Sequence, residues 1–100
     1  MLFEILKRKV HTWGLERNIY TEGTLQAQIS KIIEEANEVE IAFKDGDIDE
    51  LEKELGDVLV TVINTCKMLN IPPETCLYRA YEKIKDRKGK MLNGTFVKEL

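Results

Sequence analysis

The chain has 100 residues, of which 43% are hydrophobic and 33% charged, and its formal net charge at pH 7 is −3. This size predicts a single domain over residues 1–100, because a second hydrophobic core needs a longer chain. The negative balance argues against nucleic-acid binding, which requires a broad cationic surface. No apolar run reaches the ~20 residues that span a bilayer, and the start has no signal-peptide layout. We therefore expect a cytoplasmic protein with no membrane partner.

Apolar residues recur at helical intervals in four segments separated by short breakers. The first expected helix covers about residues 2–18 and is followed by the polar stretch ERNIYTEG. The second covers about 24–44, where alternating spacings of three and four residues make one apolar stripe. Gly46 suits the end of that helix, and Asp47 followed by Glu50 indicates a cap that starts the next one.

The third expected helix, about residues 48–69, is apolar around most of its circumference, which indicates a buried helix. Its short connection to the second predicts an antiparallel hairpin. A Pro-Pro pair precedes a fourth helix, about 73–88, and Phe96 and Val97 are expected to pack back onto the helices. Three other helices can scarcely cover the third, so we expect a homodimer or homotetramer. The predicted fold is all-α, an antiparallel four-helix bundle unit that oligomerises through its helices.

Charged residues are segregated along the chain, whereas the cysteines form no recognisable motif. Residues 22–57 hold twelve acids against three lysines, and residues 79–90 hold six bases against two acids. Together such blocks could hold a cation and an anion. Cys66 and Cys76 have neither CxxC nor zinc-site spacing, so we expect reduced core residues that belong to no site.

Acidic side chains concentrate beside the apolar stripe of the second expected helix. At ~100° per residue, one flank of the stripe carries Gln28, Lys31, Glu35 and Glu38. Glu35 and Glu38 are three residues apart and can point at the same spot, whereas Glu40 lies on the far side and is expected to be solvated. In the third helix Glu54 and Asp57 have the same spacing.

The predicted hairpin could bring these two acid pairs face to face. Four converging carboxylates repel one another and lose solvation, so the arrangement is costly without a cation. A ligand set made only of carboxylate oxygens favours a hard ion such as Mg²⁺ or Mn²⁺. The alternative is that both acid pairs are ordinary charged helix surface.

Two other metal sites are excluded by the sequence. The segment DGDIDELEKELG begins like an EF-hand loop, but Glu50 occupies its sixth position, where glycine is needed. Gly56 occupies its twelfth position, where glutamate is needed. A di-iron bundle needs Glu-x-x-His pairs, and the single histidine, His11, is distant from these acids in the sequence.

The pattern EExxE (Glu34, Glu35, Glu38), followed after fifteen residues by ExxD (Glu54, Asp57), resembles the MazG-like branch of the all-α nucleoside triphosphate pyrophosphohydrolases. The resemblance covers roughly residues 24–97, and the ending DRKGKMLNGTFVKE looks like that of short stand-alone members, several of them phage-encoded. Further matching positions are Lys31, Asn64, the segment LNIPPE (69–74), Lys83 and Arg87. Tyr81 departs from the pattern, since longer members often carry asparagine there.

The resemblance implies an enzyme that splits a nucleoside triphosphate between its α and β phosphates. It implies a Mg²⁺ site, with Mn²⁺ as a possible substitute, whose ligands are Glu35, Glu38, Glu54 and Asp57. Glu34 would order or deprotonate the attacking water, so the implied catalytic residues are Glu34, Glu35 and Glu38. The cellular role would be cleaning or adjustment of nucleotide pools. The alternatives are a deoxypyrimidine-specific relative that acts on dUTP or dCTP, and a catalytically silent helical dimer that serves as an interaction module.

Substrate-binding candidates complete the predicted site. Lys31, Lys83 and Arg87 are natural phosphate partners, although a basic helix end is equally explained by the helix dipole. Asn64 either reads a base or sugar edge or is a structural hydrogen-bonding residue. Trp13 either stacks on a base or belongs to the core. Gln28 is a further candidate, on the acidic flank.

Overall fold

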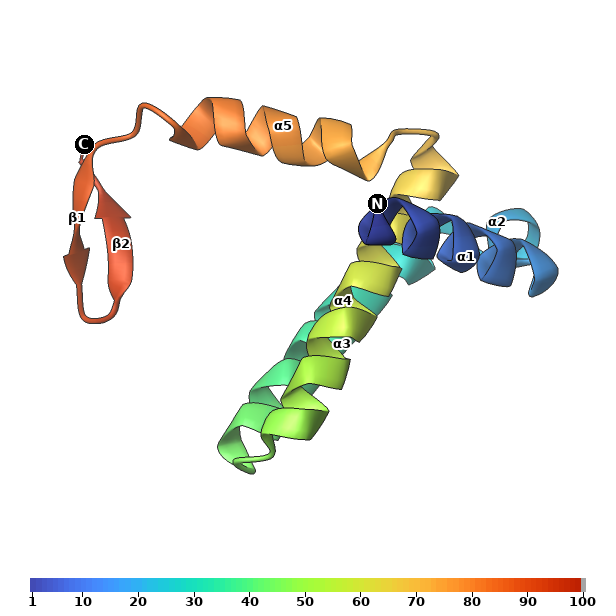
Figure 1. The fold of residues 1–100 in the computed structure, drawn as a ribbon, viewed down its shortest axis with the longest axis horizontal. Helices are drawn as coiled ribbons and strands as arrows, with labels where there is room; N and C mark the ends of the chain where they lie inside the picture. Colours follow the sequence, from blue (N-terminus) through green and yellow to red (C-terminus); the bar gives the residue numbers. More distant parts are fainter. Residues whose placement is uncertain (100) are drawn as a thin grey trace.

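A computed structural model describes residues 1–99, and within them the chain forms five helices and a two-stranded sheet (Figure 1). In chain order the elements are α1 (Leu2–Glu16), α2 (Ile19–Glu22), α3 (Leu25–Lys44), α4 (Ile48–Leu69), α5 (Pro73–Ile84), β1 (Gly89–Leu92) and β2 (Thr95–Lys98). The predicted all-α class is confirmed. Within residues 1–99, no helix combines the length and the apolar character that a bilayer span requires.

The antiparallel hairpin of α3 and α4 is the frame of the molecule (Figure 1). The Thr24 hydroxyl accepts a hydrogen bond from the Ala27 backbone N–H at 3.1 Å and caps α3. The Asp47 carboxylate accepts one from the Glu50 N–H at 3.0 Å and caps α4. Between the helices, Gly46 has a φ of 70°, a conformation that glycine adopts without strain. The predicted stop, cap and hairpin are all confirmed.

The first expected helix ends at Glu16, two residues early, and the polar stretch after it forms the short helix α2. Asn18 joins the two helices with a φ of 60°, which asparagine tolerates better than most residues. Gly14 is buried against Tyr20, because a Cβ on Gly14 would lie 2.5 Å from the Tyr20 hydroxyl oxygen. Glycine at this position therefore lets α2 fold back beside α1, where both helices contact α4.

Helix α5 projects from the rest of the chain as an arm (Figure 1). It ends at Ile84, four residues before the expected end, and all its residues except Pro73 are exposed. The radius of gyration is 15.9 Å, whereas a compact domain of this length has one of about 13 Å. In one chain α5 therefore does not join the other helices in a closed four-helix bundle.

The tail forms a β-hairpin, which the sequence analysis did not anticipate. Leu92 in β1 pairs with Thr95 in β2, and the two-residue turn between them is Asn93-Gly94. Both turn residues have positive φ, 51° and 84°, as Asn-Gly hairpin turns require. The hairpin lies beyond the far end of α5 (Figure 1). The expected packing of the tail onto the helices is therefore wrong for a single chain.

The core within one chain is small and centred on α4. The buried apolar residues of residues 1–99 are Ala42, Ile63 and Cys66, joined by buried Lys7, Thr61, Asn64 and Thr65. Helix α4 was expected to be buried around most of its circumference, but Leu55 and Leu59 are 50% and 52% exposed. The chain covers only one side of α4, because α5 extends away from it.

We predict that Ile63→Ala lowers the free energy of unfolding by about 2–4 kcal/mol, the usual cost of truncating a buried aliphatic side chain. Ile63 is 5% exposed, whereas Ile48, at the turn end of the hairpin, is 72% exposed. Ile48→Ala should therefore change stability by less than about 1 kcal/mol. Urea denaturation at matched protein concentration measures both values. Equal losses would show that the core does not lie at Ile63.

Candidate active site

The α3–α4 hairpin brings three of the four predicted metal ligands together. Glu35 on α3 and Glu54 and Asp57 on α4 each place one carboxylate oxygen within 4.8 Å of the others. Glu35 and Glu54 are partly buried, whereas Asp57 is exposed. Glu38, one turn farther along α3, is exposed and does not belong to this group. The three grouped residues are called the carboxylate cluster below.

The surroundings of Glu54 raise the pKa of its carboxyl group. Its pKa is raised to about 7, first by a hydrogen bond with the Glu50 side chain, then by burial and by the negative charges of Asp57, Glu50 and Glu35. Glu54 is therefore partly protonated near neutral pH. A cation among the three oxygens would relieve the repulsion, and an all-oxygen ligand set suits a hard divalent ion.

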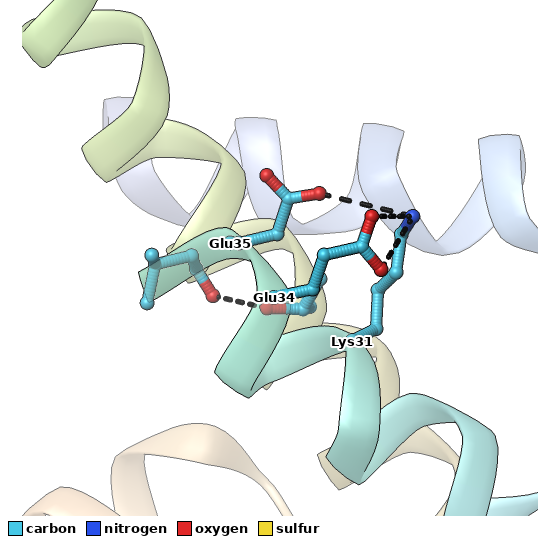
Figure 2. A network of polar contacts seen from close by, with 5 residues as sticks. Lys31, Glu34 and Glu35 are labelled. Carbon is cyan, nitrogen blue, oxygen red and sulfur yellow. Dashed lines mark hydrogen bonds and ion pairs between the residues drawn. The ribbon is translucent and has the colours of Figure 1, made fainter. Parts of the chain in front are cut away.

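Lys31 supplies the positive charge next to the carboxylate cluster. Its ammonium nitrogen lies 3.3 Å from a Glu34 oxygen and 3.9 Å from a Glu35 oxygen, so it bridges two of the three predicted catalytic acids (Figure 2). The Lys31 and Glu34 side chains are 48% and 60% exposed, whereas that of Glu35 is only 16% exposed. Solvent screens the pair with Glu34, so that contact is weakly held.

A pocket of about 240 Å³ opens beside the carboxylate cluster. Its lining comes from α1 to α4: Trp13, Ile19, Gln28, Lys31, Glu35, Asp57, Val60, Thr61 and Asn64. Four of the six predicted substrate-binding residues are among them: Trp13, Gln28, Lys31 and Asn64. Lys83 and Arg87 are not. Because α5 ends at Ile84 and not near residue 88, Arg87 lies beyond the helix that was expected to carry both bases.

Asn64 is the most deeply buried of the pocket residues, at 2% exposure. Its side-chain oxygen accepts a hydrogen bond of 2.5 Å from the Tyr20 hydroxyl, and burial raises the pKa of Tyr20, which keeps that hydroxyl a donor. The structural role considered for Asn64 is therefore present. Sequence reasoning missed Tyr20 and Ile19 because they lie in a stretch interpreted as a polar connection. Their only signal was an apolar pair inside that stretch.

Two further pocket residues have features that suit a ligand. The side-chain oxygen of Gln28 is buried and has no hydrogen-bond partner within residues 1–99. Such an acceptor is costly unless something donates to it. The Trp13 ring is 42% exposed, and the Arg17 guanidinium carbon lies 4.6 Å from its centroid. This cation–π contact helps to hold the indole at the pocket edge rather than in the core.

Known proteins resemble this chain over the segment that contains the carboxylate cluster. The sequence profile of the MazG nucleotide pyrophosphohydrolase domain matches residues 23–92. The nucleoside triphosphate pyrophosphohydrolase/pyrophosphatase MazG of Thermotoga maritima is 41% identical over 61 residues. That match covers 61% of this chain but only 23% of the relative. No solved structure gives a significant match to the chain.

The raised pKa of Glu54 predicts how the stability of the metal-free protein varies with pH. A folded-state pKa of about 7 against an ordinary value of 4.5 means that the folded chain retains a proton that the unfolded chain has lost. The stabilisation from this proton is complete below 4.5 and is lost as the pH rises through about 7. Glu54→Gln should remove this decline. Urea denaturation with a chelator, from about pH 5 to about pH 8, measures it.

The matched control is Glu40→Gln, on the far side of α3. The Glu40 carboxylate pairs with Lys44 at 3.1 Å, and its side chain is 70% exposed. This variant should retain the wild-type decline in stability. An unchanged decline in Glu54→Gln would show that the titrating group is not Glu54.

Proposed function

Because the chain belongs to the MazG nucleotide pyrophosphohydrolase family, we propose that it hydrolyses nucleoside or deoxynucleoside triphosphates to the monophosphate and pyrophosphate. The observation that carries the proposal is the meeting of Glu35, Glu54 and Asp57 at the edge of a mixed polar and apolar pocket. Clustered carboxylates can hold a cation, while the pocket offers the groups that recognise a base. The cellular role would be the cleaning or adjustment of nucleotide pools.

The carboxylate cluster fits a divalent cation, Mg²⁺ or, as a substitute, Mn²⁺. Its donors are all carboxylate oxygens, and the pKa of Glu54, raised by the hydrogen bond with Glu50, by burial and by the nearby negative charges, favours a proton that a cation would displace. Glu38 is the proposed fourth ligand, since it follows Glu35 by almost one turn on the same flank of α3. When bound, the cation would neutralise charge on the phosphate oxygens and acidify a water molecule.

Lys31 and Glu34 are proposed to act on the phosphates and the water. The ion pair between them is exposed, so Lys31 can exchange a carboxylate oxygen for a phosphate oxygen at little cost. That exchange would free Glu34 to accept a proton from the attacking water. Glu35 is more buried and keeps its position in the carboxylate cluster, so neighbouring acids on one helix have separate roles.

The base and sugar would occupy the apolar side of the pocket. Trp13 offers a ring face for stacking, and the unpartnered Gln28 oxygen can accept a hydrogen bond from a base or sugar. The Tyr20 hydrogen bond restricts rotation of the Asn64 amide. A deoxypyrimidine-specific relative would share the metal ligands and differ only in this lining. Kinetics with each nucleotide therefore distinguish the two substrate classes.

We further propose that the chain works as a homodimer in which α5 of each copy packs on the other copy. One side of α5 is apolar at helical spacing, with Leu77 72%, Tyr81 56% and Ile84 49% exposed. A mostly apolar groove of about 580 Å³ lies between α1 and α4, and its lining includes Gly56 and Asp57. Soluble monomers rarely leave such large apolar surfaces uncovered.

The proposed dimer gives the basic residues of the arm a possible role. The groove reaches Asp57, a member of the carboxylate cluster. An α5 helix lying in it with its C-terminal end toward Asp57 would bring Lys83 and Arg87 of the second copy near that cluster. Their predicted contact with phosphates would then be made across the dimer rather than within one chain.

The activity is tested by product analysis with a panel of ribonucleoside and deoxynucleoside triphosphates, with Mg²⁺ and with chelator. Monophosphate and pyrophosphate should appear only with the cation. Glu35→Gln, Glu38→Gln and Glu54→Gln should lower kcat by at least about 100-fold, because each removes a cation ligand. Glu40→Gln, on the same helix as two of them, should keep the wild-type rate. A folded wild type that binds Mg²⁺ but turns over no nucleotide would favour the silent interaction module.

The assembly is tested by sedimentation equilibrium. The wild type should have twice the chain mass of 11.6 kDa, and Leu77→Asp should shift it to a monomer because a charge cannot be buried in an apolar groove. Ile48→Asp is the matched control, since Ile48 has the same 72% exposure but lies at the opposite end of the hairpin from α5. A wild-type monomer would refute the dimer, and four times the chain mass would indicate the homotetramer.

A further inference from the structure

Two cysteines lie side by side at the base of the α5 arm. Cys66 is near the end of α4, Cys76 is in the first turn of α5, and their sulfur atoms are 3.8 Å apart. Both are free thiols. A disulfide bond places two sulfurs about 2.05 Å apart, so the pair needs a shift of less than about 2 Å to form one. The expectation of reduced core residues is confirmed for Cys66, whereas Cys76 is exposed, and only the bend between the helices brings the two residues together.

The backbone at this bend holds the two cysteines in register. Asn70 has a φ of 57°, and the Ile71 N–H donates to the Cys66 carbonyl at 3.0 Å, which closes the end of α4. Pro72 then precedes α5, and Pro73 is its first residue. The buried Lys7 ammonium donates to the Glu74 carboxylate at 2.6 Å, which ties the first turn of α5 to α1. The closeness of the thiols therefore follows from an ordered bend.

The two thiols differ in their access to solution. Cys76 is exposed, whereas Cys66 is 5% exposed, and burial raises the pKa of its thiol. A reagent from solution therefore meets Cys76 first, because exchange needs an accessible thiolate. Cys66 is shielded from such a reagent but is adjacent to Cys76. This is the arrangement of an attacking cysteine and a resolving cysteine.

We propose that Cys66 and Cys76 form a reversible disulfide within one chain by exchange with a small disulfide such as oxidised glutathione. Deprotonated Cys76 attacks one sulfur of the reagent, which breaks the reagent's S–S bond and releases one glutathione thiolate. Cys66 then loses its proton to solvent and attacks the Cys76 sulfur, which breaks the mixed disulfide and releases the second glutathione thiolate. Two protein thiols are oxidised, and one oxidised glutathione is reduced to two thiols after protonation. Excess reduced glutathione reverses both steps.

The disulfide would restrict the bend from which α5 departs. It closes a ring over residues 66–76 and joins the last turn of α4 to the first turn of α5. The arm carries the exposed apolar side of α5 and its basic residues, so oxidation would limit the directions in which they can point. This restriction depends only on the bend and not on the proposed enzymatic activity.

The test equilibrates the full chain with graded ratios of oxidised to reduced glutathione, quenches with acid, alkylates the remaining thiols and measures the intact mass. The wild type should convert to a species that is lighter by two hydrogens and takes up no alkyl group. Reduced glutathione should restore it. A chain that instead retains bound glutathione, or a disulfide between two chains on a non-reducing gel, would overturn the proposal.

Two variants separate the roles of the thiols, and circular dichroism verifies that each is folded. Cys66→Ser should stop at the mixed disulfide and carry one glutathione, because its resolving thiol is missing. Cys76→Ser should remain reduced, because its remaining thiol is buried. Glutathione on Cys66 in this second variant, at the rate seen for Cys76, would contradict the assigned order of attack.

Hydrogen exchange tests the consequence for the arm. In the oxidised wild type the amides between the two cysteines, residues 67–71 and 74–75, should exchange more slowly than in the reduced protein. The amides of the α3–α4 turn, residues 45–47, provide the internal control and should not change. Equal exchange at the bend in both states would show that the disulfide does not restrict α5.

Discussion

The apolar seam between α3 and α4 is the interaction on which the rest of the structure depends. Burial of the seam determines how each helix is rotated about its own axis. The rotation in turn determines which side chains beside the seam lie next to one another. Glu35, Glu54 and Asp57 are therefore held within 4.8 Å of one another despite their like charges. The pKa of Glu54 is raised by its hydrogen bond with Glu50, by burial and by these like charges, and Lys31 pairs with the acids of α3. The scaffold thus imposes the repulsion that a cation would relieve.

The second constraint is that one chain leaves much of its apolar surface exposed. Helix α1 covers part of α4, but Leu55 and Leu59 remain about half exposed, and the apolar residues of α5 are about half exposed or more. The pocket has the same incompleteness, since its basic candidates Lys83 and Arg87 lie on and beyond the arm. In the proposed dimer a second copy would supply both the missing cover and the basic residues, because Asp57 of the carboxylate cluster lines the groove between α1 and α4.

The bend between α4 and α5 decides where the arm points, and it is built from a few local interactions. An asparagine at positive φ ends α4, two prolines start α5, and the Lys7–Glu74 ion pair fastens the first turn. The same interactions bring the two cysteine sulfurs together. One short segment therefore determines both the direction of α5 and the distance between the two thiols. A change in the bend is expected to alter both.

Sequence alone determined the features that depend on neighbours three or four residues apart. The Asp47 cap, the Gly46 stop and the acid pairs all follow from helical spacing, so α3, α4 and the meeting of Glu35 with Glu54 and Asp57 could be predicted. The Asn-Gly turn of the tail had the same kind of local signal and was overlooked. Only the tertiary structure decided the contact of Tyr20 with Asn64, the pairing of Cys66 with Cys76 and the separation of Lys83 from the pocket. These depend on the angles between helices, which are set by whole turns and packed surfaces rather than by any residue spacing.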